Sequence, residues 1–314
     1  MKILITGGGG FQGSHLAEFL LSQGHQISVL NTFSERSISN LSKIKDKINL
    51  IWGSITDKEL IEKTVRGHDV VFHLAAHINV DESLKDPVVF FYVNILGTYN
   101  VLEAVRKNNS RLIYTSTCEV YGDGHELKEG ELLDEQTELR PNSPYAASKA
   151  SADRICYSYY KSFGLDVTIV RPFNIFGERQ KSGQFGALIP ILTARALRGE
   201  DLTVFGTGEA TRDYSHVSDT IQGYNLVLNN PNLKGKVINF ASGEKTRIID
   251  IANYIADKFG VKVTHAAPRP GEVTRFPADI SFARSLGYKS DVTIWQGLDR
   301  YTDWAKENRD LFIR

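Results

Sequence analysis

The chain has 314 residues, enough for one large α/β unit with an elaborated end or for two closely joined lobes. Hydrophobic residues make up 41% and charged residues 24%, as in an ordinary soluble globular protein. Lysine plus arginine equals aspartate plus glutamate, at 37 each, so no global field favours nucleic acid or an anionic membrane.

The two cysteines, Cys118 and Cys156, are too few for a disulfide framework and fit a reducing compartment. Neither their spacing nor that of the eight histidines matches a metal-binding pattern. The first residues enter a short apolar strand and four glycines, unlike a signal peptide, and the longest apolar runs are shorter than the roughly 18 residues of a membrane span. We therefore expect a cytoplasmic protein without a metal site or a membrane segment.

Short apolar runs alternate with amphipathic stretches through the first half of the chain. The predicted strands are Lys2–Thr6, Gln26–Leu30, Asn49–Trp52, Val70–Leu74, Arg111–Thr115 and Val167–Arg171. The predicted helices include Ser14–Gln23, Pro87–Asn108 and Pro144–Phe163. This alternation predicts an α/β fold with a Rossmann-like, doubly wound parallel sheet.

The second half has a different pattern, in which glycine-rich loops surround a predicted helix at Leu188–Arg198. The apolar run Val237–Phe240 is predicted to rejoin the sheet. We expect residues 1–172 to form the Rossmann domain with the catalytic residues. Residues 173–314 are expected to form mainly a smaller, interleaved C-terminal substrate lobe, of which about 203–240 returns to the sheet.

Three glycines, Gly7, Gly10 and Gly13, recur at three-residue intervals between the first predicted strand and the following helix. Glycine permits a tight turn and a close backbone approach, and the helix N-terminus offers unpaired N–H groups to a pyrophosphate. A glycine-rich turn without a ligand is the less favoured interpretation. The position at the start of a βαβ unit predicts a dinucleotide site.

The GxxGxxG spacing resembles the extended branch of the short-chain dehydrogenase/reductase superfamily, whose cofactor is NAD or NADP. That family carries an acidic residue at the end of the second strand, where this chain has Asn31. An amide still bonds a ribose hydroxyl but repels a 2′-phosphate less than a carboxylate does, so NAD is favoured and NADP stays open. A second acidic family position reads Ser54, next to Ile55.

Tyr145 and Lys149 lie in the run Ser143-Pro144-Tyr145-Ala146-Ala147-Ser148-Lys149, which opens a predicted helix. A four-residue interval places both side chains on one helix face. A free tyrosine has a pKa near 10, and a neighbouring ammonium together with a positive nicotinamide is expected to lower it. Such a pair alone is commonly a solvated helix face, but with the glycine loop it predicts a catalytic tyrosine and its lysine.

The resemblance to nucleotide-sugar epimerases and dehydratases covers nearly the whole chain. Its landmarks are Phe72-His73-Leu74-Ala75-Ala76, Asn94-x-x-Gly97-Thr98-x-Asn100, Arg171-Pro172-Phe173-Asn174, Arg212-Asp213-Tyr214 and Arg269-Pro270-Gly271-Glu272. The resemblance implies a cofactor site made of Gly7, Gly10, Phe11, Gln12, Gly13, Asn31, Ser54, Ile55, Leu74, Ala75, Ala76, Asn94, Thr115, Tyr145, Lys149 and Pro172. It also implies that the Thr117 hydroxyl bonds the substrate beside Tyr145.

Cys118 and Glu119 bear on which reaction follows oxidation at C4 of the sugar, because the 4-ketone acidifies the proton on C5. In the 4,6-dehydratases that this run resembles, Asp-Glu stands here, with Glu as the C5 base and Asp as the acid for the departing C6 hydroxyl. Glu119 matches the base, whereas Cys118 is either a thiol donor or a small buried hydrophobe. The run also resembles a branch that forms 5,6-unsaturated sugar nucleotides.

We therefore expect a 4,6- or 5,6-type dehydratase. A UDP-sugar 4-epimerase and a UDP-glucuronate decarboxylase are alternatives within the family, and a catalytically inactive NAD-sensing module is the alternative of another class.

The substrate implied by the resemblance is a nucleotide-diphosphate sugar, with UDP the family's most frequent nucleotide. A neutral chain must neutralise the diphosphate locally, and the planar guanidinium groups of Arg212 and Arg269 suit that task. Asn174, Leu188 and His77 complete the expected substrate contacts. By the same resemblance we expect a homodimer formed through Pro87–Asn108 and Pro144–Phe163, and no nucleic-acid partner.

Overall fold

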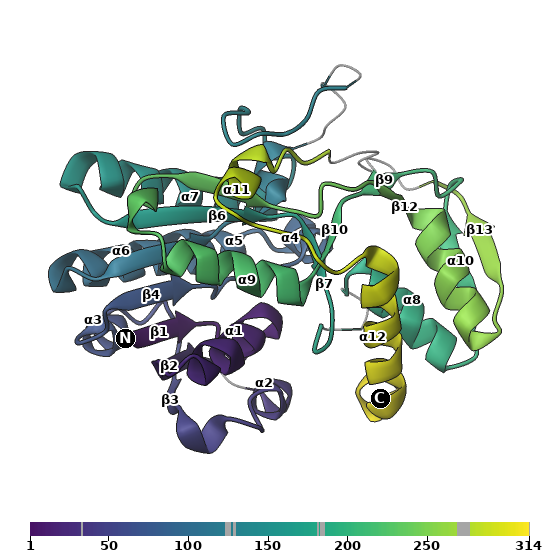
Figure 1. The fold of residues 1–314 in the computed structure, drawn as a ribbon, viewed down its shortest axis with the longest axis horizontal. Coiled ribbons are helices and arrows are strands. Elements are labelled where there is room, and N and C mark those ends of the chain that lie inside the picture. Colours follow the sequence, from purple (N-terminus) through teal and green to yellow (C-terminus); the bar gives the residue numbers. More distant parts are fainter. Residues whose placement is uncertain are drawn as a thin grey trace.

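A parallel sheet of seven strands forms the centre of the computed structural model, which describes residues 1–32, 34–122, 127, 130–180, 182, 186–268 and 277–313 (Figure 1). Its strands are β1 (Lys2–Thr6), β2 (Gln26–Asn31), β3 (Asn49–Trp52), β4 (Val70–His73), β5 (Arg111–Thr115), β6 (Val167–Pro172) and β11 (Val237–Phe240). They lie in the order β11-β6-β5-β4-β1-β2-β3 and pair in parallel throughout. The order reverses beside β1, and ligands bind at such a switch point in open α/β sheets. The predicted Rossmann-like sheet is confirmed.

The sheet is buried on both faces, because successive side chains of β1 pack into hydrophobic cores on opposite sides of it. Ile3 and Ile5 pack toward α1 (Phe11–Ser22) and α9 (Val217–Leu228), whereas Leu4 packs on the opposite face. That opposite face is covered by α3 (Lys58–Val65), α6 (Gly97–Asn108) and α7 (Pro144–Phe163). Strands buried on both faces explain the continuous apolar runs of the sequence.

The predicted helix Pro87–Asn108 forms as three joined pieces. These are α5 (Val88–Phe90), the π-helix η2 (Phe91–Leu96) and α6. Among the described residues, Val88–Asn108 is the one helical stretch long and apolar enough to cross a membrane by length and composition, but half of it is buried inside the protein. A core helix has the same composition, so this stretch is weak evidence for a membrane segment.

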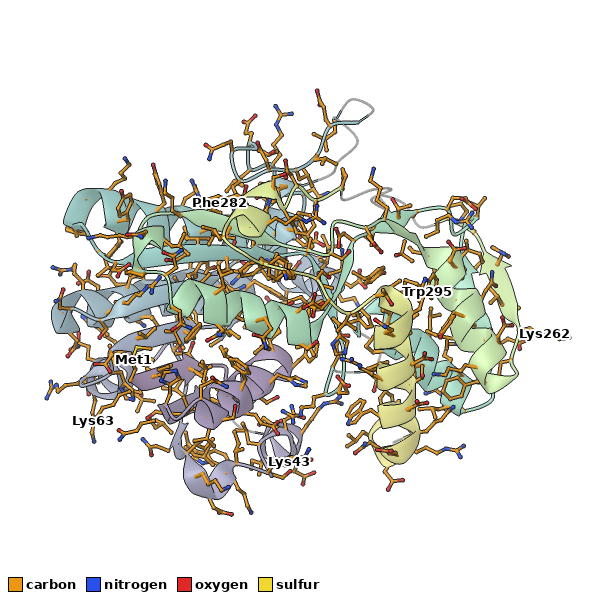
Figure 2. All side chains as sticks on the ribbon, in the orientation of Figure 1. Met1, Lys43, Lys63, Lys262, Phe282 and Trp295 are labelled. Atoms are coloured by element: carbon orange, nitrogen blue, oxygen red, sulfur yellow. The ribbon has the colours of Figure 1, made fainter. Side chains whose placement is uncertain are left out.

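A second lobe has its own hydrophobic core, visible on the right of Figure 1. Its elements are α8 (Leu188–Leu197), β8 (Leu202–Phe205), α10 (Ile248–Phe259), β13 (Val263–Ala266), α12 (Ile294–Glu307) and α13 (Asp310–Ile313). Strand β8 pairs with β13 in this lobe and not with the central sheet. The chain therefore comes back to the central sheet at α9, and not near residue 203 as predicted. In Figure 2, Trp295 lies on α12 in the second lobe, while Phe282 lies over the sheet.

The remaining elements are short. They are α2 (Glu35–Asn40), η1 (Lys45–Lys47), α4 (Val80–Lys85), η3 (Cys118–Tyr121), β7 (Asn174–Phe176), β9 (Thr211–Arg212), β10 (Tyr214–His216), η5 (Pro231–Leu233), β12 (Thr246–Arg247) and α11 (Ser281–Ser285). Strand β7 pairs with β10 in parallel, and β9 pairs with β12 in antiparallel fashion. These pairs place polar residues of the second half beside the carboxyl ends of the sheet strands.

Candidate active site

The glycine-rich loop makes a cradle that no larger residue would fit. Gly7 has a φ of +72°, and a Cβ atom there would lie 2.7 Å from the amide nitrogen of Ala75. At Gly13 a Cβ atom would lie 2.4 Å from the carbonyl oxygen of Gly7. The following helix α1 begins without a side-chain cap. Its first N–H groups are therefore available to an anion, as in dinucleotide sites.

A cavity of about 370 Å³ opens above this cradle. Its lining residues are Gly7, Gly10, Phe11, Gln12, Gly13, Leu30, Asn31, Thr32, Gly53, Ser54, Ile55, Leu74, Ala75, Ala76, His77, Ile78, Val93 and Thr115. Twelve of the sixteen predicted cofactor residues are among them. The cradle and the apolar walls fit a dinucleotide, and we call this space the cofactor cavity.

The ribose end of the cofactor cavity carries no charged side chain among the described lining residues. Asn31 and Ser54 line it, as expected. Ser54 shares a hydrogen bond with Thr56 at 2.8 Å. The nearby Arg36 donates instead to the carbonyl oxygen of Gln180, at 3.0 Å, so its guanidinium group is engaged across the molecule. This arrangement favours NAD over the 2′-phosphate of NADP.

Asn94, expected to contact the cofactor, lies behind the cavity wall. It is 1% exposed, and its Oδ1 accepts from the backbone nitrogen of His77 at 2.7 Å. Its Nδ2 donates to the His77 carbonyl oxygen and to Ser148 Oγ, both at 2.9 Å. With its donors and acceptor used in this way, Asn94 ties the loop after β4 to α7. Pro172 is likewise buried at the end of β6 and does not line the cavity.

The N-terminus of α7 positions Tyr145 and Lys149. Ser143 caps this helix by accepting from the backbone nitrogen of Ala146 at 3.1 Å, and Pro144 occupies its first turn, where its missing N–H costs nothing. Lys149 is 4% exposed and donates to the carbonyl oxygen of Thr115 at 2.7 Å. Burial lowers the pKa of Lys149 to about 8, against the raising effect of Cys156 and Asp153.

The tyrosine has the opposite shift from the one expected. Burial raises the pKa of Tyr145, and the Glu119 carboxylate raises it further, while a hydrogen bond with Thr117 lowers it. Lys149 is not among the groups that shift this pKa; its ammonium lies 4.5 Å from the ring centre of Tyr114 and bonds the Thr115 carbonyl, and the lowering expected from Lys149 together with a positive nicotinamide stays a prediction. Without a cofactor, Tyr145 is therefore a neutral phenol beside the Thr117 hydroxyl.

Thr117, Cys118 and Glu119 form the start of η3, directly after β5. Thr117 caps this turn, because its Oγ1 accepts from the backbone nitrogen of Glu119 at 3.3 Å. Burial and then the Glu119 charge raise the pKa of the Cys118 thiol, which is 3% exposed. Burial also raises the pKa of Glu119, and Arg212 opposes that rise. The pKa of Glu119, raised by burial, is thus lowered in part by Arg212, which lies on β9 in the second half of the chain.

A second cavity, of about 290 Å³, lies beside Arg212. It is lined by Asn174, Ile175, Phe176, Gln180, Ala187, Leu188, Ile189, Arg212, Tyr214 and Ile248, and we call it the substrate cavity. It unites three of the five predicted substrate residues beyond Thr117. His77 instead lines the cofactor cavity, where its Nε2 lies 3.1 Å from Glu82. Arg269 lies outside the described residues.

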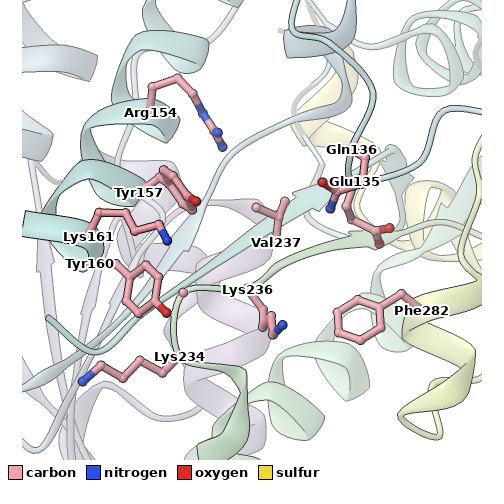
Figure 3. A pocket seen from close by; sticks show the side chains of 11 residues that line it. Glu135, Gln136, Arg154, Tyr157, Tyr160, Lys161, Lys234, Lys236, Val237 and Phe282 are labelled. Atoms are coloured by element: carbon pink, nitrogen blue, oxygen red, sulfur yellow. The ribbon is translucent and has the colours of Figure 1, made fainter. Parts of the chain in front are cut away.

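A larger cavity, of about 570 Å³, lies away from both (Figure 3). The later turns of α7 and the start of β11 form it, and its cations, among them Arg154, Lys161 and Lys236, are exposed. No predicted site residue lines it. Lysines beside an edge strand commonly prevent pairing with another chain, which accounts for these charges.

Sequence reasoning missed Tyr224, a fully buried residue of α9. Its hydroxyl lies 2.8 Å from Thr115 Oγ1 and donates to Gln12 Oε1 at 3.1 Å. Both partners line the cofactor cavity. No local motif marks Tyr224, because its partners are 109 and 212 residues away in the sequence.

Comparison with known proteins agrees with this geometry. A "Putative UDP-glucose 4-epimerase" of Methanocaldococcus jannaschii is 32% identical over 98% of this chain and 99% of that protein. A UDP-N-acetyl-alpha-D-glucosaminuronate decarboxylase of Bacillus cytotoxicus is 36% identical over 98% of each chain. The structure of the dTDP-glucose 4,6-dehydratase DesIV of Streptomyces venezuelae with NAD bound superposes with a TM-score of 0.90, at 32% identity over 99% of this chain and 98% of that one.

The sequence profile of the family described as "NAD dependent epimerase/dehydratase family" matches residues 3–241, which include the glycine cradle, Tyr145 and Lys149. With that match and the full-length relatives, the chain belongs to the NAD-dependent epimerase/dehydratase family.

Proposed function

We propose that this protein is an NAD-dependent nucleotide-sugar dehydratase, which removes water from the hexose of a nucleotide-diphosphate sugar. The observation that carries the proposal is the position of Glu119. Its carboxylate raises the pKa of Tyr145, and Arg212 in turn opposes the burial that raises the pKa of Glu119, so its charge is felt by both groups. A carboxylate close enough to affect the catalytic tyrosine, and affected by an arginine of the substrate cavity, is suited to act on the sugar carbon next to the oxidised one.

The first step is common to the family's reactions. NAD held in the cofactor cavity would supply the redox chemistry, as acceptor and later donor of the hydride from C4. Tyr145 takes the proton of the C4 hydroxyl, and the Thr117 hydroxyl orients that group. The Lys149 ammonium, held by the Thr115 carbonyl, supplies positive charge near the site. The positive charge of an oxidised nicotinamide would offset the burial that raises the Tyr145 pKa.

The second step removes water across C5 and C6. Glu119 accepts the C5 proton, and its raised pKa makes the carboxylate a stronger base. The C6 hydroxyl leaves as water with a proton from Cys118, whose raised thiol pKa keeps it protonated, or with the proton that Glu119 has just taken. In a 4,6-dehydration with Cys118 as the acid, the hydride would return to C6 and Glu119 would return its proton to C5. When a 5,6-double bond is retained, the hydride would return to C4 and Tyr145 would return its proton to the C4 oxygen.

The substrate cavity supplies the contacts for the nucleotide diphosphate. Arg212 provides a planar guanidinium group for the diphosphate. Leu188 and Ile189, at the start of α8, offer an apolar wall for a base, and Asn174 adds an amide at the edge. UDP and dTDP sugars are the first candidates, since the relatives named above act on both.

Product analysis with a substrate labelled at C4 tests the proposal. We would incubate the holoenzyme with UDP- and dTDP-hexoses carrying deuterium at C4 and follow products by NMR. Deuterium at C6 of a 4-keto-6-deoxy sugar supports 4,6-dehydration, and deuterium at C4 of a 5,6-alkene supports the 5,6 type. Inversion at C4 without loss of water, decarboxylation of a glucuronate, or no turnover of any substrate would overturn the dehydratase assignment.

A matched pair of variants ties the result to Glu119. We expect Glu119→Gln to slow water loss by about 100-fold or more, because an amide cannot accept the C5 proton. Oxidation at C4, seen as NADH absorbance, should persist. The exposed Glu138, paired with Arg140, gives the control Glu138→Gln, which should leave turnover unchanged. Wild-type water loss in Glu119→Gln would contradict the assigned role.

A 4-epimerase is the second candidate, and one observation favours it. Among the described residues, Glu119 is the one carboxylate found to shift the pKa of Tyr145, and Cys118 is almost wholly buried. Epimerisation needs no acid for a leaving hydroxyl, so it does not require a second donor. The deuterium experiment separates this activity from dehydration.

We also propose that the protein is a homodimer. The helix formed by α5, η2 and α6 exposes large apolar side chains, with Val88 at 70%, Tyr92 at 53% and Phe91 at 41%. Phe163 at the end of α7 is 57% exposed. Such a patch marks an association surface, and a second copy would cover it. Sedimentation should show a dimer that dissociates in Tyr92→Asp, and a monomeric wild type would refute this.

A further inference from the structure

Three side chains from distant parts of the chain meet beneath the cofactor cavity. Gln12 lies in the first turn of α1, Thr115 ends β5, and Tyr224 comes from α9. The Tyr224 hydroxyl is 2.8 Å from Thr115 Oγ1 and 3.1 Å from Gln12 Oε1. Phe72 and Phe240 pack against the Tyr224 ring in T-shaped contacts, with ring centroids 5.9 and 6.4 Å away. The tyrosine is therefore rigid as well as buried.

The available protons fix which group donates and which accepts in each of these hydrogen bonds. Tyr224 has a single hydroxyl proton, and Gln12 Oε1 can only accept. The phenol therefore donates to Gln12, and the Thr115 hydroxyl donates to the phenol. Burial raises the pKa of Tyr224, so it stays protonated. Gln12 Oε1 is thus held toward the protein interior.

The amide nitrogen of Gln12 is left for a ligand. Gln12 lines the cofactor cavity and is only partly buried, and within the described part of the chain no hydrogen bond engages its Nε2. It stands in the first turn of α1, where the N–H groups offered to an anion converge. An amide whose oxygen is tied back presents its two N–H donors on the open side.

We propose that Tyr224 is a positioning residue that fixes the Gln12 amide as a donor to the pyrophosphate of the dinucleotide. Thr115 joins the same chain to the catalytic lysine, because its carbonyl oxygen accepts from Lys149 Nζ at 2.7 Å. Thr115, at the end of β5, is thus linked to Gln12 through Tyr224 and bonds Lys149 directly. The inference rests on dinucleotide binding and not on the dehydration step, so the two fail independently.

Dissociation of NAD from the holoenzyme, with rebinding by titration calorimetry, tests this inference. Tyr224→Phe keeps the ring and removes both hydrogen bonds. We expect it to weaken NAD binding by about 5- to 10-fold, or about 1 kcal/mol. Gln12→Leu should lose at least as much, and the double variant should be no weaker than Gln12→Leu alone. Tyr301→Phe removes another buried tyrosine hydroxyl, in the second lobe, and should leave NAD affinity unchanged.

Gln12→Glu gives a sharper result with little risk to folding, since the side chain is partly exposed. One carboxylate oxygen can still accept from Tyr224, while the other replaces the donor with a negative charge. We expect an NAD affinity at least 100-fold lower with an unchanged thermal midpoint. Wild-type NAD affinity in Tyr224→Phe or Gln12→Glu, or additive effects in the double variant, would overturn the proposal.

Discussion

The cofactor cavity and the substrate cavity are built by different means. The first lies at the ends of β1, β2, β4 and β5, where the main chain and glycines shape it. The second is lined by side chains from β7, β9 and α8, outside the central sheet. In the cofactor cavity an added atom clashes with main chain that cannot move aside. In the substrate cavity each side chain can be substituted separately, so the contacts with the ligand are lost one at a time. Glu119, in η3 after β5, is coupled to the substrate cavity through Arg212, which opposes the rise of its pKa on burial.

Gly13→Ala should have the largest effect, because it adds an atom to the site made of main chain. The new Cβ would lie 2.4 Å from the Gly7 carbonyl oxygen, and main chain cannot move aside. We expect a purified protein with almost no NAD and a loss of about 1 to 3 kcal/mol in unfolding free energy. Gly10→Ala, with 3.1 Å to the same oxygen, should be milder. Full NAD occupancy in Gly13→Ala would refute the contrast between the cavities.

Arg212→Gln tests the cavity made of side chains. Loss of a charged contact to the diphosphate should raise KM about 10- to 100-fold while NAD content stays at the wild-type level. Because Arg212 opposes the raised pKa of Glu119, the acid limb of the kcat profile should also move to higher pH. Arg247→Gln, which alters an exposed arginine paired with Asp250 and Glu209, is the control. An unmoved KM would remove Arg212 from the substrate site.

Lys149→Met tests whether this buried lysine is needed for activity although it lowers the stability of the fold. Burial lowers the lysine pKa to about 8 in the folded protein, below its ordinary value of 10.5. Between these values the unfolded chain binds more protons, so wild-type stability should rise as pH increases from 8 toward 10.5. At pH 7 the variant should be more stable by about 1 to 3 kcal/mol, yet inactive. Chemical denaturation at pH 7 and 10 measures this, and a less stable variant would contradict it.

The smallest effect is expected at the joint between the two regions. Burial alone would raise the pKa of Glu178, but its pairing with His216, at 3.3 Å, outweighs burial and lowers that pKa to about 2. A carboxyl group with a depressed folded pKa stabilises the protein above its unfolded value of 4.5, and this is lost as pH falls toward 2. We expect Glu178→Gln to lose about 1 kcal/mol at pH 7 and nothing near pH 2. Equal loss at both pH values would argue against the ion pair.

The local features of this protein could be predicted from residues that are neighbours in the chain. Apolar runs buried on both faces of the sheet and the Ser143-Pro144 helix start are encoded by neighbouring residues, as is the three-residue glycine spacing. Their physical causes act over one turn or one strand, so pattern alone reveals them. The roles of Thr117 and Glu119 were predicted from the resemblance of the run after β5 to the family, and they stay predictions.

The contacts between side chains that are distant in the sequence could not be predicted, because they depend on the tertiary fold. In the fold, His77 lines the cofactor cavity, Asn94 bonds the loop after β4 to α7, and Lys149 donates to the Thr115 carbonyl. It also brought Tyr224 to Gln12, across 212 residues. Such contacts depend on strand order and on where helices cross the sheet, and no local pattern contains that information. Burial, which sets the pKa values of Tyr145, Glu119 and Lys149, exists only once the two halves have packed together.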